Sequence, residues 1–372
     1  MKIMTAILVQ LSLLWGLSAS GPSPDTMTTA TPGASEHSMA EAMFYQVIDD
    51  RTLQCLICFR ECIIPEGERG FCRNKEHIDG VLYSLVHSRP SAVQVDPIEK
   101  EPQFHNLPGS RILCVGTAGC NYACRHCHNW HLSQQSIDDI RYMNMTPEHL
   151  VSEAMMREVR TISFTYNDPI SMYEYVYDTA RLAAQHGLNI LWHSNGSMNP
   201  EPLRELLKYT HAVTIDLKGF SSHAYQNSRA SLEPVLEALK IIGKSDVWLE
   251  IVNLVIPTIN DDPEEIRAMC RWISEHLGNE VPLHFTRFVP AYRLTHLPRT
   301  PVETLEQAYA IAREEGLSYV TIGNVPGHQY NSTFCPSCDS RVIHRTHFTV
   351  IENLLIDGAC RECGHSVPGI WK

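Results

Sequence analysis

The sequence predicts an α/β fold, a partial parallel (β/α) barrel of six to seven strands with small cysteine-rich modules at its N- and C-terminal ends. Short β-branched segments alternate with helical periodicity between residues 111 and 324, and no run of hairpins interrupts them. Eleven of the 13 cysteines fall into three clusters, two of which lie outside that stretch. The alternation of strands and helices predicts the barrel. The two cysteine clusters outside it predict the small modules at the two ends of the chain.

The seven predicted strands cover residues 112–116, 161–166, 189–195, 211–217, 247–255, 282–288 and 318–324. Helix starts are marked by Thr146-Pro147, Asp262-Pro263 and Thr300-Pro301, where a capping residue precedes a first-turn proline. Another amphipathic helix covers residues 171–186 and ends at Gly187. Seven such units favour a barrel. A doubly wound open sheet is the alternative, but no GxGxxG follows any strand.

Composition narrows the functional class. The chain has 372 residues, 44% of them hydrophobic and 19% charged, which is typical of a globular protein of two to three domains. Its 30 basic and 42 acidic residues give a net charge of -12. Binding of nucleic acid without sequence preference depends on surplus Lys and Arg, so we expect no nucleic-acid partner.

The central cysteine cluster has the pattern Cys120-x3-Cys124-x2-Cys127 and follows the first barrel strand, where barrel enzymes carry their active sites. Three thiolates on one loop can hold three irons of a [4Fe–4S] cluster and leave the fourth iron open. S-adenosylmethionine can bind an open iron, which brings its sulfonium close for one-electron cleavage. The alternative is zinc, with His126 or His128 as the fourth ligand.

The cysteine triplet resembles that of the radical S-adenosylmethionine superfamily. Four segments further resemble the AmmeMemoRadiSam system radical enzymes, a group related to the pyruvate formate-lyase activating enzyme. These segments are Thr117-Ala-Gly-Cys-Asn-Tyr-Ala-Cys-Arg-His-Cys-His-Asn-Trp130, Thr165-Tyr-Asn-Asp-Pro169, Ile215-Asp-Leu-Lys-Gly-Phe220 and Gly323-Asn-Val-Pro-Gly-His328. The resemblance extends from about residue 43 to the end of the chain. It implies a radical S-adenosylmethionine core over residues 105–330, with Cys120, Cys124 and Cys127 as ligands of a [4Fe–4S] cluster.

The resemblance also implies a set of S-adenosylmethionine contacts at the ends of the barrel strands. Asn167 and Asp168 occupy the place of the superfamily's Gly-Gly-Glu stretch, whose acid accepts hydrogen bonds from the amino group of S-adenosylmethionine. Asn195 would approach the ribose, and Lys218 would face the methionine carboxylate with Asp216 beside it. A solvated pair at a strand end is the alternative for Asp216 and Lys218.

The implied function is that of a radical enzyme. The cluster reductively cleaves S-adenosylmethionine to a 5'-deoxyadenosyl radical, which abstracts hydrogen from a substrate that the sequence does not name, a protein being one candidate. Activation of a glycyl-radical enzyme is one alternative. A zinc-stabilised, non-catalytic interaction protein is the alternative from another class. Expected partners are an electron donor such as flavodoxin or ferredoxin, and Memo-like and AMME-syndrome-candidate-like proteins.

The C-terminal cluster, within residues 331–372, consists of two CxxC pairs, Cys335 with Cys338 and Cys360 with Cys363. Two facing pairs supply four thiolates in the tetrahedral arrangement of a zinc ribbon or rubredoxin-like site. We expect zinc in a structural role, because about 40 residues rarely fold without such support.

The N-terminal cluster, within residues 44–104, consists of Cys55, Cys58, Cys62 and Cys72. Four thiolates within 18 residues fit either structural zinc or an auxiliary iron–sulfur cluster, and the neighbouring glycines and proline favour zinc. Cys114 and Cys270 stand alone in a strand and a helix and are predicted to be core residues.

The first 20 residues resemble a secretory signal, with Lys2, an apolar run and then small residues. Residues 21–43 have the composition of a disordered linker. The alternative is an over-extended start, with translation beginning at Met27, Met39 or Met43. Iron–sulfur clusters are assembled in reducing cytoplasm, so we expect a cytoplasmic protein, with export as the alternative. No later stretch is long and apolar enough to predict a membrane span.

Overall fold

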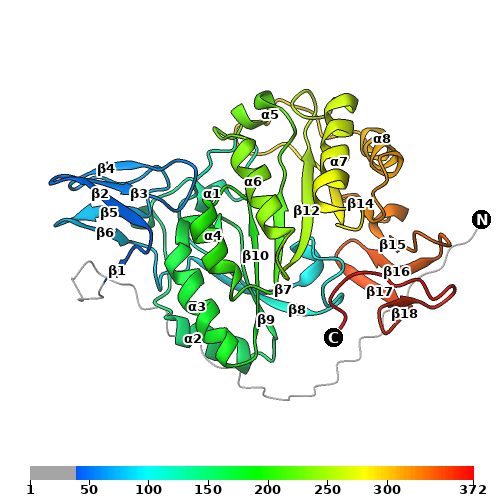
Figure 1. Ribbon diagram of the computed structural model, residues 1–372, viewed down its shortest axis with the longest axis horizontal. Helices are drawn as coiled ribbons and strands as arrows, with labels where there is room; N and C mark the ends of the chain where they lie inside the picture. The colour runs from blue at the N-terminus through cyan, green and yellow to red at the C-terminus, as the bar shows by residue number, and fades with distance from the viewer. Residues whose placement is uncertain (1–38) are drawn as a thin grey trace, which may run out of the picture. The chain divides into compact units, whose positions relative to one another are not determined.

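The computed structural model describes residues 39–372, and an eight-stranded sheet forms its centre (Figure 1). Seven neighbouring strands run parallel and follow one another in chain order, which confirms the predicted partial barrel. These strands are β8 (Arg111–Gly116), β9 (Thr161–Phe164), β10 (Asn189–Ser194), β11 (Ala212–Asp216), β12 (Trp248–Val255), β13 (Leu283–Arg287) and β14 (Val320–Gly323).

The eighth strand, β7 (Ala92–Pro97), pairs antiparallel with β8 at one edge of the sheet. We expected this stretch to belong to the N-terminal cysteine-rich segment, residues 44–104, and that placement is wrong. Pairing of Val93 with Val115 and of Val95 with Leu113 makes β7 part of the barrel wall. The prediction missed β7 because the next regular strand, β8, follows it without an intervening α-helix, so β7 does not fit the strand–helix alternation.

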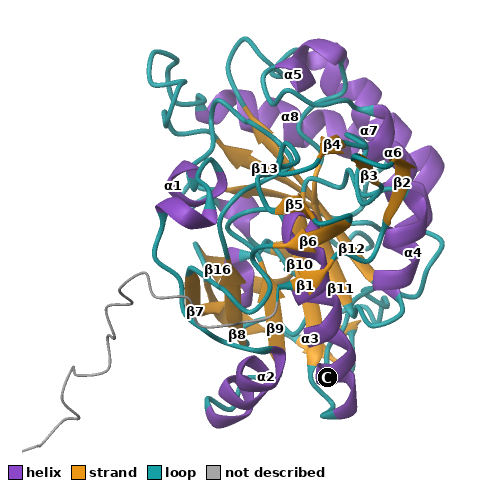
Figure 2. Cartoon of the chain, turned by 90° about the vertical axis from the view of Figure 1, so that its left-hand side faces the viewer, coloured by secondary structure: helices purple, strands orange, loops and turns teal. Residues whose placement is uncertain are grey.

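The α-helices of the described residues are α1 (Trp130–Ser133), α2 (Pro147–Met156), α3 (Tyr173–Gln185), α4 (Pro200–Leu207), α5 (Ser222–Gln226), α6 (Glu233–Ile242), α7 (Pro263–Leu277) and α8 (Val302–Glu314). The longer helices, α2 to α4 and α6 to α8, cover the outer face of the sheet, and the short helices α1 and α5 lie on connecting loops (Figure 2). The side chains of Thr146 and Asp262 cap α2 and α7 as predicted. Thr300 does not cap α8, because its hydroxyl donates to the Val255 carbonyl (2.6 Å) and accepts from the Phe288 amide (3.1 Å). It ties two strand ends together instead.

Strand β12 shows how the two faces of the sheet differ. Leu249, Ile251 and Val255 point outward and join the main hydrophobic core beneath the helices. The alternate residues Glu250 and Val252 belong to the inner face. The barrel interior is therefore lined by a different and more polar set of side chains than the core outside it.

One end of the barrel interior is closed by the segment 98–109, which begins with the short helix η1 (Ile98–Lys100). The Gln103 side chain donates to the Val213 carbonyl and the Thr214 hydroxyl (both 2.9 Å). The buried Glu250 carboxylate accepts the backbone amides of Phe104 and His105 (both 2.8 Å). The opposite end, where the parallel strands finish, stays open.

His284, Cys114 and Cys270 are all buried. The imidazole of His284 lies 2.7 Å from Glu250 and 2.6 Å from the Thr321 hydroxyl, so it is a satisfied interior group. The structure thus gives both lone cysteines the core positions expected of them.

Two three-stranded sheets precede the barrel, with strand orders β1-β6-β5 and β2-β3-β4. Their strands are β1 (Ala40–Glu41), β2 (Tyr45–Asp49), β3 (Thr52–Cys55), β4 (Ile63–Pro65), β5 (Lys75–Ile78) and β6 (Val81–Ser84). The predicted linker was to end at residue 43, but Ala40 and Glu41 pair with β6 and correct that boundary. The signal-like segment, residues 1–20, and residues 21–38 lie outside the described residues.

The C-terminal module contains five short strands, β15 (Thr333–Phe334), β16 (Arg341–Thr346), β17 (Thr349–Asn353), β18 (Leu355–Ile356) and β19 (Ala359–Cys360). Arg345 of β16 anchors the module to the barrel. Its fully buried guanidinium donates to the Phe104 carbonyl (2.5 Å) and lies 3.7 Å from the Glu99 carboxylate. Within residues 39–372, no helix has the length and apolarity required to cross a membrane.

Candidate active site

A cavity of about 320 Å³ lies at the open end of the barrel, where the parallel strands finish. It brings together the cysteine triplet and all five residues predicted to contact S-adenosylmethionine, although these positions span about 100 residues of sequence. Its lining includes Cys120, Cys124, Cys127, Asn167, Asp168, Asn195, Asp216 and Lys218.

Asn167 holds the loop that leads into the triplet. Its side-chain oxygen accepts the Thr117 amide (2.9 Å), and its side-chain nitrogen donates to the Gly119 carbonyl (2.9 Å) and the Ser171 hydroxyl (3.1 Å). Asn167 follows Tyr166, which has a φ of 69° and turns the chain sharply after β9. Both the oxygen and the nitrogen of the Asn167 side-chain amide form hydrogen bonds within the protein. Asn167 therefore holds the loop in place and is not a free ligand for a bound molecule.

Asp168 ties this turn to the end of β10. One carboxylate oxygen accepts the Ile170 amide (3.0 Å) and the Ser194 hydroxyl (3.0 Å), and the other accepts the Asn195 amide (2.7 Å). Burial raises the pKa of Asp168 to about 6, although these hydrogen bonds oppose the shift. The Ser194 hydroxyl also lies 3.3 Å from the second oxygen, so hydrogen bonds within the protein reach both oxygens of this cavity-lining carboxylate.

Asn195 reaches the triplet from β10. Its side-chain nitrogen donates to the side-chain oxygen of Asn121 (2.7 Å), the residue after Cys120. Its side-chain oxygen accepts the hydroxyl of Ser197 (2.6 Å), and Asn121 donates to that same hydroxyl (2.9 Å). This closed triangle of side chains fixes the loop between Cys120 and Cys124 against the barrel rim.

Asp216 and Lys218 form an ion pair at the end of β11, with 2.7 Å between the ammonium and the carboxylate. His193 of β10 lies 3.4 Å from the other Asp216 oxygen and 3.3 Å from Glu101. Burial would lower the pKa of His193, but these two acids outweigh it and raise that pKa to about 10. Lys218 and His193 likewise outweigh burial at Asp216 and hold its pKa below the usual value.

The sequence-based site did not include His193 or Glu101. In β10, Ile190 and Trp192 join the outer core, whereas Leu191 lies in the interior cluster and His193 lines the cavity. Strict alternation along the predicted strand could have identified His193 as an interior histidine facing Asp216. Nothing in the sequence indicates that Glu101, which lies outside the seven predicted strands, reaches this point.

The triplet thiols suit a multi-iron cluster. Burial raises the pKa of Cys120 well above its usual value, while the Tyr122 amide donates to its sulfur (3.4 Å) and favours the thiolate. Among residues 39–372, no set of three metal-ligating atoms that includes these thiols lies within 4.8 Å. The histidine alternative is weakened as well, because His126 pairs with Asn227 (3.0 Å) and His128 with the Val289 carbonyl (3.1 Å).

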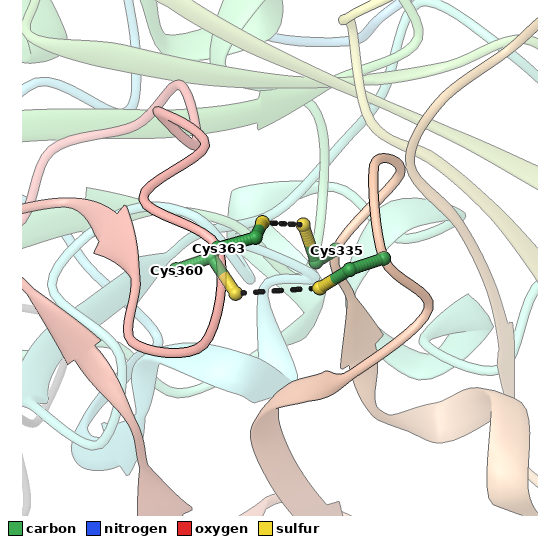
Figure 3. Close-up of side chains that lie close together, drawn as sticks. Cys335, Cys360 and Cys363 are labelled. Atoms are coloured by element: carbon green, nitrogen blue, oxygen red, sulfur yellow. Dashed lines mark hydrogen bonds between the residues drawn. The ribbon is translucent and has the colours of Figure 1, made fainter.

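The C-terminal cysteines form a tighter arrangement (Figure 3). The sulfurs of Cys335 and Cys363 are 3.6 Å apart, those of Cys338 and Cys360 are 3.7 Å apart, and all four lie within 4.8 Å of one another. A tetrahedral ion with metal–sulfur bonds of about 2.3 Å requires sulfur separations of about 3.8 Å. The four thiols therefore fit one metal ion.

The N-terminal cysteines lie on the loops that follow β3 and precede β5. Cys55 ends β3, Cys58 and Cys62 lie between β3 and β4, and Cys72 lies three residues before β5. Negative charges on Cys55, Cys72 and Cys62 all raise the pKa of Cys58, so the four thiols are mutual neighbours. They do not line the cavity at the barrel mouth.

Comparisons with known proteins agree with this geometry. Residues 114–273 match the model of the radical SAM superfamily. The uncharacterized protein MJ0808 of Methanocaldococcus jannaschii is 44% identical over 331 residues, covering 88% of this chain and 99% of that protein. The chain belongs to the radical SAM superfamily. A second uncharacterized protein of that organism, MJ0674, is 23% identical over 290 residues, covering 72% of this radical SAM chain and 76% of its own length.

Two solved structures are also similar to this radical SAM protein. A domain of a pyruvate-formate lyase-activating enzyme from Bacteroides vulgatus has 19% identity and a TM-score of 0.39, covering 44% of this chain and 98% of its own. A radical SAM methyltransferase from Sphaerobacter thermophilus has 12% identity and a TM-score of 0.46, covering 76% of each chain. The radical SAM domain makes the protein an enzyme and implies a [4Fe–4S] cluster and S-adenosylmethionine as cofactors.

Proposed function

We propose that this enzyme binds its [4Fe–4S] cluster on Cys120, Cys124 and Cys127, and that it binds S-adenosylmethionine beside it in the cavity at the barrel mouth. The observation that carries the proposal is the shared cavity. The three thiols of the triplet, the Lys218 ammonium and the Asp168 carboxylate all line the same space of about 320 Å³.

Two charged groups in the cavity suit parts of the cofactor. Lys218 is close enough to the triplet for Cys124 to raise its pKa, and its ammonium would bind the methionine carboxylate. The Asp168 carboxylate, which lines the same cavity, would bind the amino group. Asn167 and Asn195 would act as positioning residues, because their amides hold the triplet loop.

When bound, the reduced cluster supplies the electron that splits S-adenosylmethionine into methionine and a 5'-deoxyadenosyl radical, which takes a hydrogen atom from the substrate. The chain's own contribution is to exclude water from this space. Val252, Leu254 and Phe104 contribute to the apolar part of the cavity wall. His347 and Phe348, in the turn between β16 and β17, also line the cavity, so the C-terminal module would contact the substrate.

The proposed partners are inferred from the resemblance to the AmmeMemoRadiSam system radical enzymes. An external one-electron donor of the flavodoxin or ferredoxin class would reduce the cluster. Memo-like and AMME-syndrome-candidate-like proteins would supply the substrate or act in the same pathway. Activation of a glycyl-radical enzyme is compatible with the kinship, but no described residue favours it over another hydrogen abstraction.

The test is an anaerobic assay for 5'-deoxyadenosine after reconstitution with iron and sulfide and reduction with dithionite. The wild type should form the nucleoside from S-adenosylmethionine, and Cys127→Ala should form none. Cys270→Ala removes one buried cysteine of α7 outside all three clusters and should match the wild type. Equal nucleoside formation by Cys127→Ala and the wild type, or none by either, would overturn the proposal.

A further inference from the structure

We propose that Cys55, Cys58, Cys62 and Cys72 bind a second [4Fe–4S] cluster rather than a zinc ion. Four cysteines in one place can complete the coordination of all four irons, so this cluster would have no open iron for S-adenosylmethionine. Its role would therefore differ from that of the triplet's cluster. The proposal does not depend on cleavage of S-adenosylmethionine, because it concerns only what these thiols hold.

Every thiol of this set has a backbone amide donor. The amides of Ile57, Arg60 and Asn74 donate to Cys55, Cys58 and Cys72, each from two residues further along the chain. The Phe71 amide donates to Cys62 (3.5 Å).

Such bonds favour the thiolate, the form that binds metal, and they tune iron–sulfur clusters. Buried thiols with this pattern of donors are better explained as metal ligands than as free thiols.

The spread of the thiols distinguishes a cluster from a single ion. In the part of the chain that the structure describes, the Cys335, Cys338, Cys360 and Cys363 set is the one group of three or more potential ligands gathered within 4.8 Å. No three of the N-terminal thiols lie within 4.8 Å of one another, although Cys55, Cys62 and Cys72 are all near enough to Cys58 to act on it. Ligands of a four-iron cluster attach to four separate irons and require this wider spacing, as the triplet does.

The N-terminal set packs directly against the triplet loop. A Cβ atom built on Gly119 would lie 2.3 Å from the Cys72 carbonyl oxygen, and the Asn74 side chain donates to the Ala118 carbonyl (2.7 Å). The Arg60 guanidinium donates to the Asn121 carbonyl (2.5 Å).

The test counts metals in the anaerobically purified and reconstituted protein. We expect about eight irons, about eight sulfides and about one zinc per chain in the wild type. The variant Cys120→Ala/Cys124→Ala/Cys127→Ala, which leaves the N-terminal set intact, should keep about four irons and a reducible four-iron EPR signal. Cys55→Ser/Cys58→Ser should lose the second cluster, whereas Cys270→Ala should keep both.

About four irons and about two zincs in the wild type, with no iron in the triplet variant, would overturn the proposal. The wild type and the triplet variant decide the question even if Cys55→Ser/Cys58→Ser fails to fold. Failure of the proposed radical function gives a different result, since it removes nucleoside formation without removing iron from the triplet variant.

Discussion

The side-chain oxygen of Asn167 accepts the backbone amide of Thr117 at 2.9 Å, and so joins the turn after β9 to the loop after β8. The same side chain donates to Gly119, the residue directly before the first cysteine of the triplet. The cysteine loop has no regular structure between β8 and α1. Its geometry therefore depends on side chains from neighbouring strand ends.

Asn167→Ala should weaken both the fold and the iron site. It leaves the buried Thr117 amide without its partner, which costs about 1 to 3 kcal/mol, and leaves the Gly119 carbonyl with the longer bond from the Ser171 hydroxyl (3.3 Å). We expect a loss of about 2 to 3 kcal/mol in the free energy of unfolding, together with reduced iron at the triplet. Urea titration and iron analysis measure the two effects. Asn279→Ala, at an exposed position, is the control, and equal behaviour of the two variants would contradict the role of Asn167.

Gly119→Ala should be far more damaging than Gly187→Ala. Both glycines have positive φ, 77° and 66°, so each alanine suffers about 1 to 2 kcal/mol of backbone strain. A Cβ at Gly119 would also collide with the Cys72 carbonyl, whereas a Cβ at Gly187 meets nothing within 4 Å. We expect Gly119→Ala to lose about 1 to 3 kcal/mol more in urea unfolding. Equal losses would show that the two cysteine sets do not pack as described.

His193 should make stability depend on pH. Its pKa is about 10 in the folded protein against 6.5 in the unfolded chain, so the folded state holds the extra proton between these values. The stabilisation of the folded state by protonated His193 is complete below pH 6.5 and is lost as the pH rises through about 10. His193→Gln should cost about 1.5 to 3 kcal/mol below pH 6.5, and this difference from the wild type should shrink toward pH 10 in thermal unfolding. A difference that does not change with pH would exclude a charged His193.

Cys363→Ser should remove the metal of the C-terminal module. The four sulfurs are spaced for one tetrahedral ion, and binding of such an ion contributes directly to folding of its module. We expect loss of about one zinc per chain and faster proteolysis near His347, with the iron of the triplet retained. Metal analysis and limited proteolysis with mass spectrometry check this. Unchanged zinc content would show that these cysteines do not hold it.

The sequence was sufficient to predict the barrel because its strands and helices alternate and because capping residues mark two of the helices. It also identified eight of the residues that line the cavity, since the ends of parallel strands meet at one edge. Thr300 was misjudged because its hydroxyl has a stronger tertiary partner at Val255 than the helix start offers. Local capping patterns do not show such competition.

Other features depend on contacts that no local pattern encodes. Glu101 reaches His193 because segment 98–109 folds into the barrel interior. Asn121 is fixed by Asn195, 74 positions away in the sequence. The spacing of the N-terminal cysteines fits zinc or a cluster, and the neighbouring glycines and proline favour zinc. Our choice of a cluster depends instead on the three-dimensional spread of the thiols.

The central claim is that S-adenosylmethionine binds at the triplet's cluster. EPR spectra of the dithionite-reduced Cys55→Ser/Cys58→Ser variant, recorded with and without S-adenosylmethionine, test it most directly because a single cluster remains. We predict that the cofactor changes the g-values of that signal, and that Lys218→Met requires more cofactor for the same change. A spectrum that S-adenosylmethionine leaves unaltered, from a variant with a full four-iron cluster, would contradict the account.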